Sequence, residues 1–483
     1  MGQRTGIRRV FAGLTALTAF GLVTAAVPPQ VAYQSVTSAQ AQAQAQVQTK
    51  AQAQAQAMAQ AAALPRVRPA ITQTVAVTNI PAPLPTSECL ANFGIHCYSP
   101  LQFRKAYNLE PLYRRGINGA GRTIVLVEAF GSPTLQHDLD MFDAQWGLPH
   151  TTVEIDRAGT IPPFDPNNGD MVNWAFETTL DVQYAHAIAP GAHIIVVETP
   201  VAQVQGTTGL PEMMNAEKAL IDAGKGDVIS QSFTSTENTF PGFDQGDYSS
   251  LLNLRYAFKA AERRQVTVLA SSGDHGVTNF ISDASDTYPF EVNAWPASDP
   301  LVTAVGGTAL NLDDSGARLS PDTAWNDVFG ATGGAKSTVF GRPAYQFGVR
   351  NVVGSRRGTP DISMTGAVDG GGFIYASFLD PDDPWQLFGG TSLACPLFAA
   401  IVAMADQMAG HRLGDIHNAL YVLGAASRIP HDPLHTGIVD VTVGDNSFGG
   451  VTGHPATKGY DLATGWGTID AAKFIPALVR ADR

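Results

Sequence analysis

The sequence predicts an α/β fold in which a mainly parallel β-sheet is covered by helices. Short runs rich in apolar and β-branched residues, each about the length of one strand, recur along the chain. These runs are Arg122–Glu128, His193–Glu198, Asp227–Phe233, Val266–Ser271 and Leu301–Val305. The amphipathic stretches of helical length are Trp174–Ala187, Tyr248–Arg264 and Ser392–Met408. Because strands of this kind have no polar face, we expect helices on both sides of the sheet.

Residues 1–32 are expected to form a secretory signal peptide. Arg4, Arg8 and Arg9 precede the uncharged stretch Val10–Val27, in which small residues come last. This order is typical of a cleaved signal. A retained membrane anchor is the weaker alternative, because the stretch is short and is diluted with glycine and threonine. We therefore expect a secreted, extracellular protein that has no contact with a membrane once the signal is cleaved.

Residues 33–87 are predicted to be a low-complexity linker. Between Ala39 and Ala63 alanine and glutamine alternate almost without interruption, and a proline-containing run from Pro65 to Pro85 follows. With so few large apolar side chains, such a segment cannot offset the entropy that it would lose on ordering. Residues 88–483 contain no comparable interruption, so they are predicted to form one large domain.

The predicted domain is strongly acidic. The chain has 43 acidic and 30 basic residues, and six of the basic residues precede Glu88, which is the first acidic one. A surface of this charge repels nucleic acids and anionic membranes, so a nucleic-acid-binding function is excluded. It suits a protein that works in acid, where part of the negative charge is neutralised.

The chain has three cysteines, of which Cys89 and Cys97 are close in sequence and Cys395 is remote. In an exported protein, one short-loop disulfide between Cys89 and Cys97 is the economical pairing. Cys395 belongs to an apolar helical stretch and is expected to be a small buried residue that stays reduced.

Ser392 is the first candidate for chemistry. It stands in the segment Gly389–Pro396, which opens the predicted helix that continues to Met408. A serine at a helix N-terminus lies in a field that favours negative charge, and the glycines allow a substrate to approach closely. The alternative is that Ser392 only caps the helix. The segment lacks the Gly-x-Ser-x-Gly spacing of the α/β-hydrolases.

Glu177 and Asp181 are candidates for acid–base chemistry. They are four residues apart on the predicted helix, so they share one face, which also carries Trp174, Leu180 and Tyr184. Two carboxyl groups that point inward among apolar side chains are expected to share a proton. The alternative is a solvated acidic face.

Asp274 is the third candidate. It follows a predicted strand in the segment Ser271–Gly276, at the edge of the sheet where sites form in α/β proteins. The alternative is that Asp274 only stabilises a turn.

Taken together, these segments resemble the sedolisins, the serine-carboxyl peptidases with a subtilisin-like fold. The motifs Glu-x-x-x-Asp, Ser-Gly-Asp-x-Gly and Gly-Thr-Ser occur in the order of that family. Further segments that look like family motifs are Tyr98–Leu109, Asp299–Thr308 and Ala331–Gly334. The resemblance implies a subtilisin-like three-layer α/β fold, with a mainly parallel sheet flanked by helices.

The resemblance also implies a role for each candidate. Ser392 would be the nucleophile, Glu177 its general base and later acid, and Asp181 the carboxyl that orients Glu177. Asp274 would line the oxyanion hole. A carboxyl group donates a hydrogen bond to an oxyanion only when it is protonated, which ties the reaction to acidic pH or to a raised pKa. Glu128 occupies the place where related enzymes often carry another acidic residue.

Near the C-terminus, two segments look like the calcium site of that family. The candidate ligands are the carboxylates of Asp440 and Asp461 and carbonyl groups at Val441, Thr457 and Gly459. Oxygen ligands of this kind suit one structural Ca²⁺ ion. The alternative is a pair of acidic surface loops.

The function expected from these features is that of a monomeric, secreted endopeptidase that cleaves proteins or peptides at acidic pH. Exo-acting tripeptidyl peptidase activity is one alternative, and a catalytically inactive surface or binding protein of the same fold is another. A subtilisin-type Ser/His/Asp site is a weaker one, because no histidine follows the first predicted strand at an equivalent place.

Overall fold

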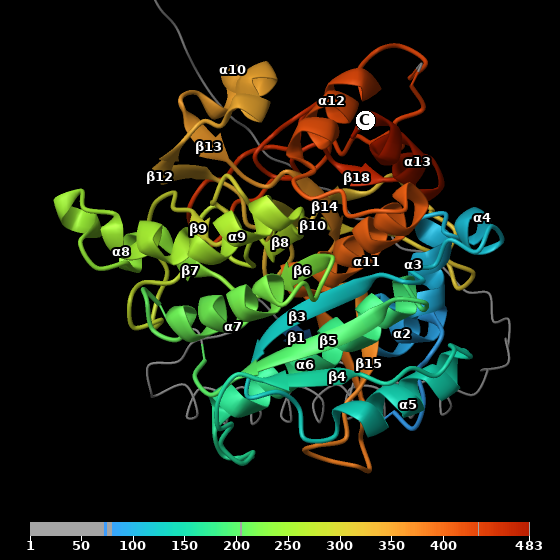
Figure 1. Cartoon of the computed structure of the whole chain (residues 1–483). Coiled ribbons are helices and arrows are strands. Elements are labelled where there is room, and N and C mark those ends of the chain that lie inside the picture. The colour runs from blue at the N-terminus through green and yellow to red at the C-terminus, as the bar shows by residue number, and fades with distance from the viewer. Residues whose placement is uncertain (1–71, 75–79, 203–204, 433, 483) are drawn as a thin grey trace, which may run out of the picture. The chain divides into compact units, whose positions relative to one another are not determined.

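The computed structural model describes residues 72–74, 80–202, 205–432 and 434–482 (Figure 1). The predicted signal peptide, residues 1–32, lies outside the described residues, as does most of the predicted linker. Two parts of the segment assigned to the linker belong to the fold. Strand β1 (Thr72–Thr74) pairs with a strand that contains Leu387 and Gly389, and helix α2 (Thr86–Phe93) begins two residues before the predicted domain boundary.

Eight strands form the main sheet in the described part of the chain, and all but one of them run parallel. Six of these strands follow one another across the sheet in the order β4 (Glu154–Arg157), β5 (His193–Thr199), β3 (Thr123–Ala129), β6 (Val228–Gln231), β8 (Thr267–Ser271) and β10 (Thr303–Ala309). The parallel strand β14 (Ile362–Thr365) and the antiparallel strand β11 (Thr323–Ala324) both pair with β10. Each of the five predicted strand segments therefore contributes one strand to this sheet.

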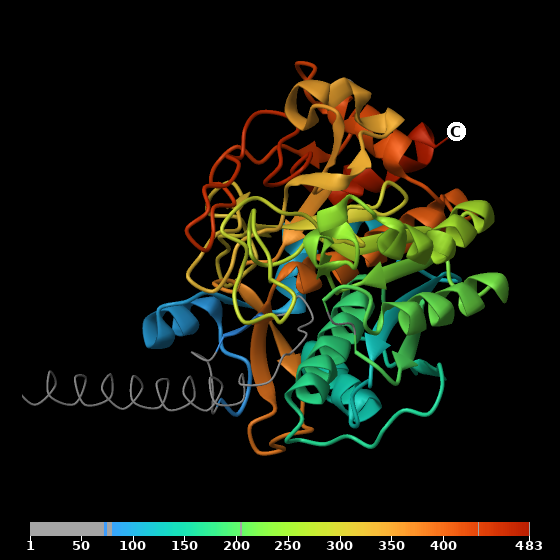
Figure 2. The same ribbon diagram turned by 90° about the vertical axis from the view of Figure 1, so that its left-hand side faces the viewer.

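Helices cover both faces of the sheet, as the apolar strand sequences predict. Along β3, Ile124 and Leu126 belong to one hydrophobic cluster, whereas Val125 and Val127 belong to another. The first cluster includes side chains of α6 (Gly169–Ile188) and α11 (Thr391–Ala409), and the second those of α7 (Leu210–Asp222) and α9 (Tyr256–Arg264). Figure 2 shows α7 and α9 together on one side of the strands. The predicted three-layer α/β fold is confirmed.

A second sheet packs beside the main one. Its four strands lie in the order β1, β16 (Trp385–Gly389), β15 (Gly371–Tyr375) and β2 (Cys97–Tyr98). Cys97 in β2 is joined to Cys89 in α2, which confirms the predicted disulfide, and Cys395 is a free, buried cysteine.

The remaining elements are short or lie at the periphery. The other helices are α3 (Pro100–Ala106), α4 (Glu110–Tyr113), α5 (Leu135–Trp146), α8 (Ser249–Leu252), α10 (Arg350–Val353), α12 (His417–Ser427) and α13 (Ala471–Ala481). The other strands are β7 (Ser235–Thr236), β9 (Ala294–Trp295), β12 (Lys336–Gly341), β13 (Arg356–Gly358), β17 (Ile438–Val439) and β18 (Thr468–Ile469). Single 3₁₀ turns form η1 (Glu237–Thr239), η2 (Phe243–Gln245) and η3 (Asn253–Arg255), and η4 spans Ala344–Val349.

The expectation of one continuous helix over Tyr248–Arg264 is wrong. The segment contains α8, the 3₁₀ turn η3 and then α9. The turn buries Leu254 while the guanidinium group of Arg255 donates to both carboxylate oxygens of Asp299 at 2.6 and 2.9 Å. Because a 3₁₀ turn changes the helical phase, apolar spacing alone did not reveal this break.

Among the described residues, α11 is the one helix that is long and apolar enough to cross a membrane. Most of it is buried inside the domain, where it packs against α6, α13 and the strands of the main sheet. Its apolar composition is therefore explained by its place in the core, and its N-terminus is held by that packing.

Candidate active site

The fold brings the four predicted catalytic residues together. Ser392 lies in the first turn of α11, Glu177 and Asp181 lie in the middle of α6, and Asp274 follows β8. The two helices pack directly against each other. All four side chains are buried, with relative exposures of 0% for the first three and 4% for Asp274.

The start of α11 is tied to Asp274. The backbone N–H and the hydroxyl of Thr391 both donate to Oδ1 of Asp274, at 2.7 and 2.8 Å. The N–H of Gly273 in turn donates to the Thr391 hydroxyl at 3.0 Å. Gly390, before the helix, has a φ of 108°, which favours glycine. These bonds fix the Asp274 carboxyl beside the residue that precedes Ser392.

The Ser392 hydroxyl lies among polar groups of two other elements. It donates to the carbonyl of Ser232 at the long distance of 3.4 Å. The hydroxyl is also close enough to Glu177 to lower the pKa of that carboxyl. Neither carboxyl oxygen of Glu177 has a well-aligned hydrogen bond in the described part of the chain. The hydroxyl of Ser392 and the carboxyl group of Glu177 are thus neighbours, and neither forms a short hydrogen bond with another residue that the structure describes.

Burial dominates the electrostatics of the carboxyl groups. It raises the pKa of Glu177 well above the usual range, and the neighbouring Asp181 charge adds to this effect. Burial also raises the pKa of Asp181 to about 8, although the Ser232 hydroxyl, at 3.1 and 2.9 Å from its two oxygens, opposes the shift. A carboxylate without a compensating charge is costly to bury. Glu177 and Asp181 together therefore retain a proton at a pH well above that at which exposed carboxyl groups ionise.

Glu128 extends the group of buried acids. It lies in β3, is fully buried, and its pKa is raised first by burial and then by the charges of Asp181 and Glu177. We call Glu128, Glu177 and Asp181 the acid cluster. It has the properties of a coupled acid–base unit, because the loss of a proton from one carboxyl group raises the pKa of the others.

Cys395 lies one turn beyond Ser392 in α11. The Ser230 hydroxyl donates to its sulfur at 3.2 Å, and burial raises the pKa of the thiol. A thiol of raised pKa is a poor nucleophile. Cys395 is therefore a packing residue, as expected from its apolar helix.

The two predicted calcium-binding segments lie next to each other. The N–H of Gly459 donates to Asp440 Oδ2 at 2.9 Å, and that of Thr457 donates to Asp461 Oδ2 at 2.7 Å. Asp461 is buried, and burial raises its pKa to about 6. No group of three or more His, Cys, Asp or Glu residues that could hold a metal is found in the described part of the chain, so carbonyl groups would have to complete the site. Two carboxylates with carbonyl-rich turns fit the hard oxygen ligands of calcium, and the calcium site stays a prediction.

Sequence analysis missed two residues of the candidate site. Ser232 holds Asp181, and Thr391 holds Asp274. Ser232 lies within a predicted strand and Thr391 just before a predicted helix, but their partners are 51 and 117 residues away, so no local pattern pointed to these bonds.

Comparison with known proteins agrees with this geometry. A model of the subtilase family matches residues 158–415, which include all four predicted catalytic residues. The chain belongs to the subtilase family. Kumamolisin of a Bacillus species is 30% identical over 79% of this chain and 64% of its own length. Sedolisin of a Pseudomonas species is 30% identical over 80% of this chain and 62% of its own length.

A solved structure of Pseudomonas sedolisin, described as a serine-carboxyl proteinase complexed with two molecules of pseudo-iodotyrostatin, superposes with a TM-score of 0.64. It is 27% identical and covers 79% of this chain and 98% of the solved chain. These similarities confirm the prediction that the chain is a member of the sedolisin family. The chain spans slightly less than two thirds of the length of kumamolisin and sedolisin.

Proposed function

We propose that this protein is a secreted serine-carboxyl endopeptidase that hydrolyses peptide bonds of proteins or peptides at acidic pH. The observation that carries the proposal is the position of Ser392, which opens a helix next to the buried Glu177, whose oxygens have no stronger partner among the described residues. Kumamolisin and sedolisin, to which the chain is similar, support the same reaction class.

In the proposed reaction, Ser392 Oγ attacks the carbonyl carbon of the scissile peptide bond while Glu177 accepts the hydroxyl proton. Glu177 then returns this proton to the leaving amine, and the acyl group remains on Ser392. A water molecule attacks the acyl carbon in the second half of the reaction, again with Glu177 as base, and releases the carboxylic acid. Asp181, held by Ser232, tunes and orients Glu177.

Asp274 serves the oxyanion in this scheme. Its Oδ1 accepts two hydrogen bonds from Thr391, which hold the carboxyl group beside the residue that precedes Ser392. A protonated carboxyl is a donor for the developing negative charge, and it exists only while the pH keeps it neutral. The acidic working pH follows from this requirement.

We also propose that one Ca²⁺ ion stabilises the structure. One Ca²⁺ ion would be held by the carboxylates of Asp440 and Asp461 and by carbonyls near Val441, Thr457 and Gly459. Such an ion stabilises the loops that carry it and takes no part in peptide hydrolysis.

The test is hydrolysis of a denatured protein by the full-length protein between about pH 2 and 8, over which carboxyl groups titrate. Ser392→Ala should reduce the rate by several orders of magnitude without changing the melting temperature. Ser250→Ala, at a distant serine, is the matched control and should retain the wild-type rate. Maximal activity above neutral pH, or full activity of Ser392→Ala, would contradict the proposal.

The same digest distinguishes endo-action from exo-action. Several relatives are tripeptidyl-peptidases, including one from Aspergillus fumigatus that is 26% identical over 76% of this chain. An endopeptidase yields fragments of mixed length from internal cleavage, whereas a tripeptidyl peptidase releases tripeptides from the N-terminus. Mass spectrometry of the early products decides between them.

A further inference from the structure

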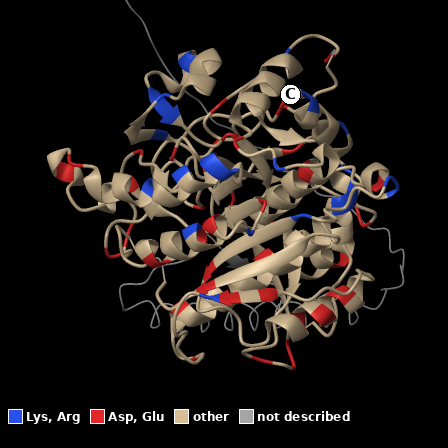
Figure 3. Cartoon of the chain, viewed as in Figure 1, with Lys and Arg blue, Asp and Glu red and all other residues tan. Residues whose placement is uncertain are grey.

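Another buried acid lies outside the acid cluster, on α7, which covers the face of the main sheet opposite to α6 and α11. Helix α7 carries the acidic residues Glu212, Glu217 and Asp222 and one lysine (Figure 3). Glu212 and Asp222 are exposed, and the lysine, Lys218, pairs with Asp222. Glu217 has a relative exposure of 0%. The fold therefore removes this one acid of α7 from water.

The hydrogen-bond partner of Glu217 is the side-chain amide of Gln231, the last residue of β6. Gln231 Nε2 donates to Glu217 Oε2 at 2.5 Å. The Oε1 atom of each residue is buried and has no hydrogen-bond partner among the described residues. Burial raises the pKa of Glu217 to about 8, and the bond from Gln231 opposes this only in part. Because buried polar atoms are nearly always hydrogen-bonded, the proton on Glu217 is the donor that Gln231 Oε1 lacks.

The surroundings of Glu217 supply no compensating cation. Its charge raises the pKa of Tyr256 on α9, whose hydroxyl donates to Asn215 Oδ1 at 2.7 Å. The charged residues of the elements packed against α7 are exposed, ion-paired or part of the acid cluster: they are Lys259, Glu262, Arg263 and Arg264 of α9, Arg255 of η3, His193 and Glu198 of β5, and Glu128 of β3. An ionised Glu217 is costly in such a place, so the protonated form is favoured.

Gln231 stands where β6 leaves the main sheet. The pairing of β6 with β8 ends at Gln231, and its pairing with β3 ends one residue earlier. Successive side chains of a strand point to opposite faces, so Gln231 faces α7 and Ser232 faces α6. Ser232 donates to both oxygens of Asp181, and its carbonyl accepts from the Ser392 hydroxyl at 3.4 Å. The bond to Glu217 thus holds the strand one residue before its contacts with two candidate catalytic residues.

We propose that Glu217 is a positioning residue for the reaction proposed above. Its protonated carboxyl group and the amide of Gln231 form two hydrogen bonds, in which Gln231 Nε2–H donates to Glu217 Oε2 and Glu217 Oε1–H donates to Gln231 Oε1. This pair fixes the end of β6 and thereby holds Ser232 against Asp181 and Ser392. The role rests on the proposed function, and Glu217 acts in it only through Gln231 and Ser232.

Kinetics of the full-length protein test this role at about pH 4, where Glu217 is protonated. Glu217→Leu cannot form the pair and should lower kcat by roughly 10- to 100-fold with KM within about twofold, because a small displacement of a catalytic group slows the chemical step. Glu217→Gln can form both hydrogen bonds as an amide–amide pair and should restore most of kcat. Glu212→Leu, at the exposed acid of the same helix, is the matched control and should have the kcat and KM of the wild type.

Rates are divided by the concentration of folded protein, measured by circular dichroism, so that a loss of folded material does not change kcat. A wild-type kcat in Glu217→Leu would overturn the proposal, and so would a Glu217→Gln variant as slow as Glu217→Leu. Absence of hydrolysis by the wild type would instead contradict the proposed function itself, which distinguishes the two failures.

A measurement that needs no activity tests the protonated pair, including the case in which Glu217→Leu does not fold. The folded-state pKa of Glu217 is about 8, against roughly 4.3 in the unfolded chain, so the stability that its proton contributes is full below about pH 4 and is lost as the pH rises toward 8. The urea midpoint of the wild type should therefore fall more steeply between about pH 5 and 8 than that of Glu217→Gln, whose amide does not titrate. Equal slopes would show that Glu217 is ionised in the folded protein and would overturn the proposal.

Discussion

Two groups of fully buried charged residues lie in the same domain and behave in opposite ways. The acid cluster of Glu128, Glu177 and Asp181 has raised pKa values. The second group, which we call the ion-paired cluster, consists of Arg357, Asp361 and His417. Burial disfavours the charged form of Asp361 as well, but the Arg357 charge and the His417 contact outweigh it and hold its pKa below the usual range.

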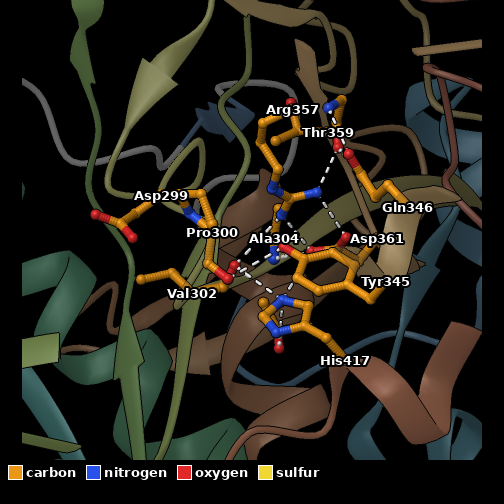
Figure 4. Close-up of polar contacts among 12 residues, drawn as sticks. Asp299, Pro300, Val302, Ala304, Tyr345, Gln346, Arg357, Thr359, Asp361 and His417 are labelled. Carbon is orange, nitrogen blue, oxygen red and sulfur yellow. Dashed lines mark hydrogen bonds and ion pairs between the residues drawn. The ribbon is translucent and has the colours of Figure 1, made fainter. Parts of the chain in front are cut away.

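The pKa values of the two clusters differ because their carboxyl groups have different hydrogen-bond and charge partners. The guanidinium of Arg357 donates to both oxygens of Asp361, at 2.7 and 2.5 Å (Figure 4). The N–H of Ala304 and the hydroxyl of Tyr421 donate to the same carboxylate. The oxygens of Glu128 and Glu177 have no such partner in the described residues. An ion pair with full hydrogen bonding serves the fold, whereas buried acids left without a cation reduce stability unless they stay protonated. This contrast supports the proposed catalytic role of the acid cluster.

The largest expected effect is a loss of activity without a loss of stability when Glu177 in the acid cluster is replaced. Glu177→Gln should lower the rate of proteolysis by roughly 10³–10⁴-fold, the upper part of the range for a lost general base, because Glu177 acts in both halves of the reaction. The melting temperature should not fall, since the substitution keeps the shape of the side chain and removes a buried carboxyl group that has no cationic partner among the described residues. Rate assays and thermal unfolding of the same preparation test both parts. A stable variant with wild-type activity would remove Glu177 from the mechanism.

The opposite result is expected in the ion-paired cluster. Asp361→Asn should cost about 3–5 kcal/mol of unfolding free energy, because it leaves the buried Arg357 without a counter-charge. Urea-induced unfolding measures this loss. Asp222→Asn is a matched control, since it removes the exposed i,i+4 pair with Lys218 and should leave the urea midpoint unchanged. If the two variants unfold at the same urea concentration, the comparison between the clusters fails.

Asp274 should give a smaller kinetic effect. Asp274→Asn keeps an acceptor for Thr391 and an N–H donor for the oxyanion, so some activity should remain after a loss of roughly 10²–10³ in turnover. Asp274→Ala, which has neither, should lose more. The amide donor does not depend on pH, so the decline in activity toward neutral pH should be shallower in Asp274→Asn than in the wild type. Equal rates for the two variants would show that Asp274 does not contact the oxyanion.

The strands and the candidate site were predictable because their signals are local. Short runs rich in apolar and β-branched residues identified β3, β5, β6 and β8, and the spacing of Glu177 and Asp181 placed them on one helical face. The order of the motifs then linked segments that no periodicity connects.

The ion-paired cluster could not be predicted in this way. Arg357 and Asp361 lie in extended segments, so their separation of four residues has no helical meaning, and His417 is 56 residues beyond Asp361. A fully buried arginine also runs against the usual surface position of that residue. The pairing of β1 with β16 was missed for a similar reason, because Thr72–Thr74 is only three residues long and its partner is more than 300 residues away.

Asp440 and Asp461 form a third group of acids, which is tested by the removal of calcium. The two carboxylates form no ion pair with a residue that the structure describes, although the charges of Arg428 and Lys458 act on Asp440. Here an ion is expected to supply the positive charge. Removal of calcium by EDTA should lower the melting temperature, corresponding to about 2.7 kcal/mol where the ion is present at a hundredfold excess over its dissociation constant. Asp461→Asn should be less stable and insensitive to EDTA. Asp445→Asn, at another acid near these loops, should respond to EDTA as the wild type does. An unchanged melting temperature in EDTA would mean that the loops hold no ion.

The last prediction concerns the pH dependence of stability, and it compares the two buried clusters directly. A folded-state pKa of about 8 for Asp181, against roughly 4 in the unfolded chain, means that the folded state binds the extra proton between these values. Stability therefore falls as the pH rises from about 4 to 8, by at most about 1.4 kcal/mol per pH unit for one proton. Asp361, with its lowered pKa, has the opposite sign and loses its contribution only when the pH falls below about 4. Unfolding free energies at several pH values should consequently show a shallower decline above pH 5 in Asp181→Asn than in the wild type. A decline of equal slope in both proteins would mean that Asp181 is already ionised in the folded enzyme, which would leave the acid cluster without its shared proton.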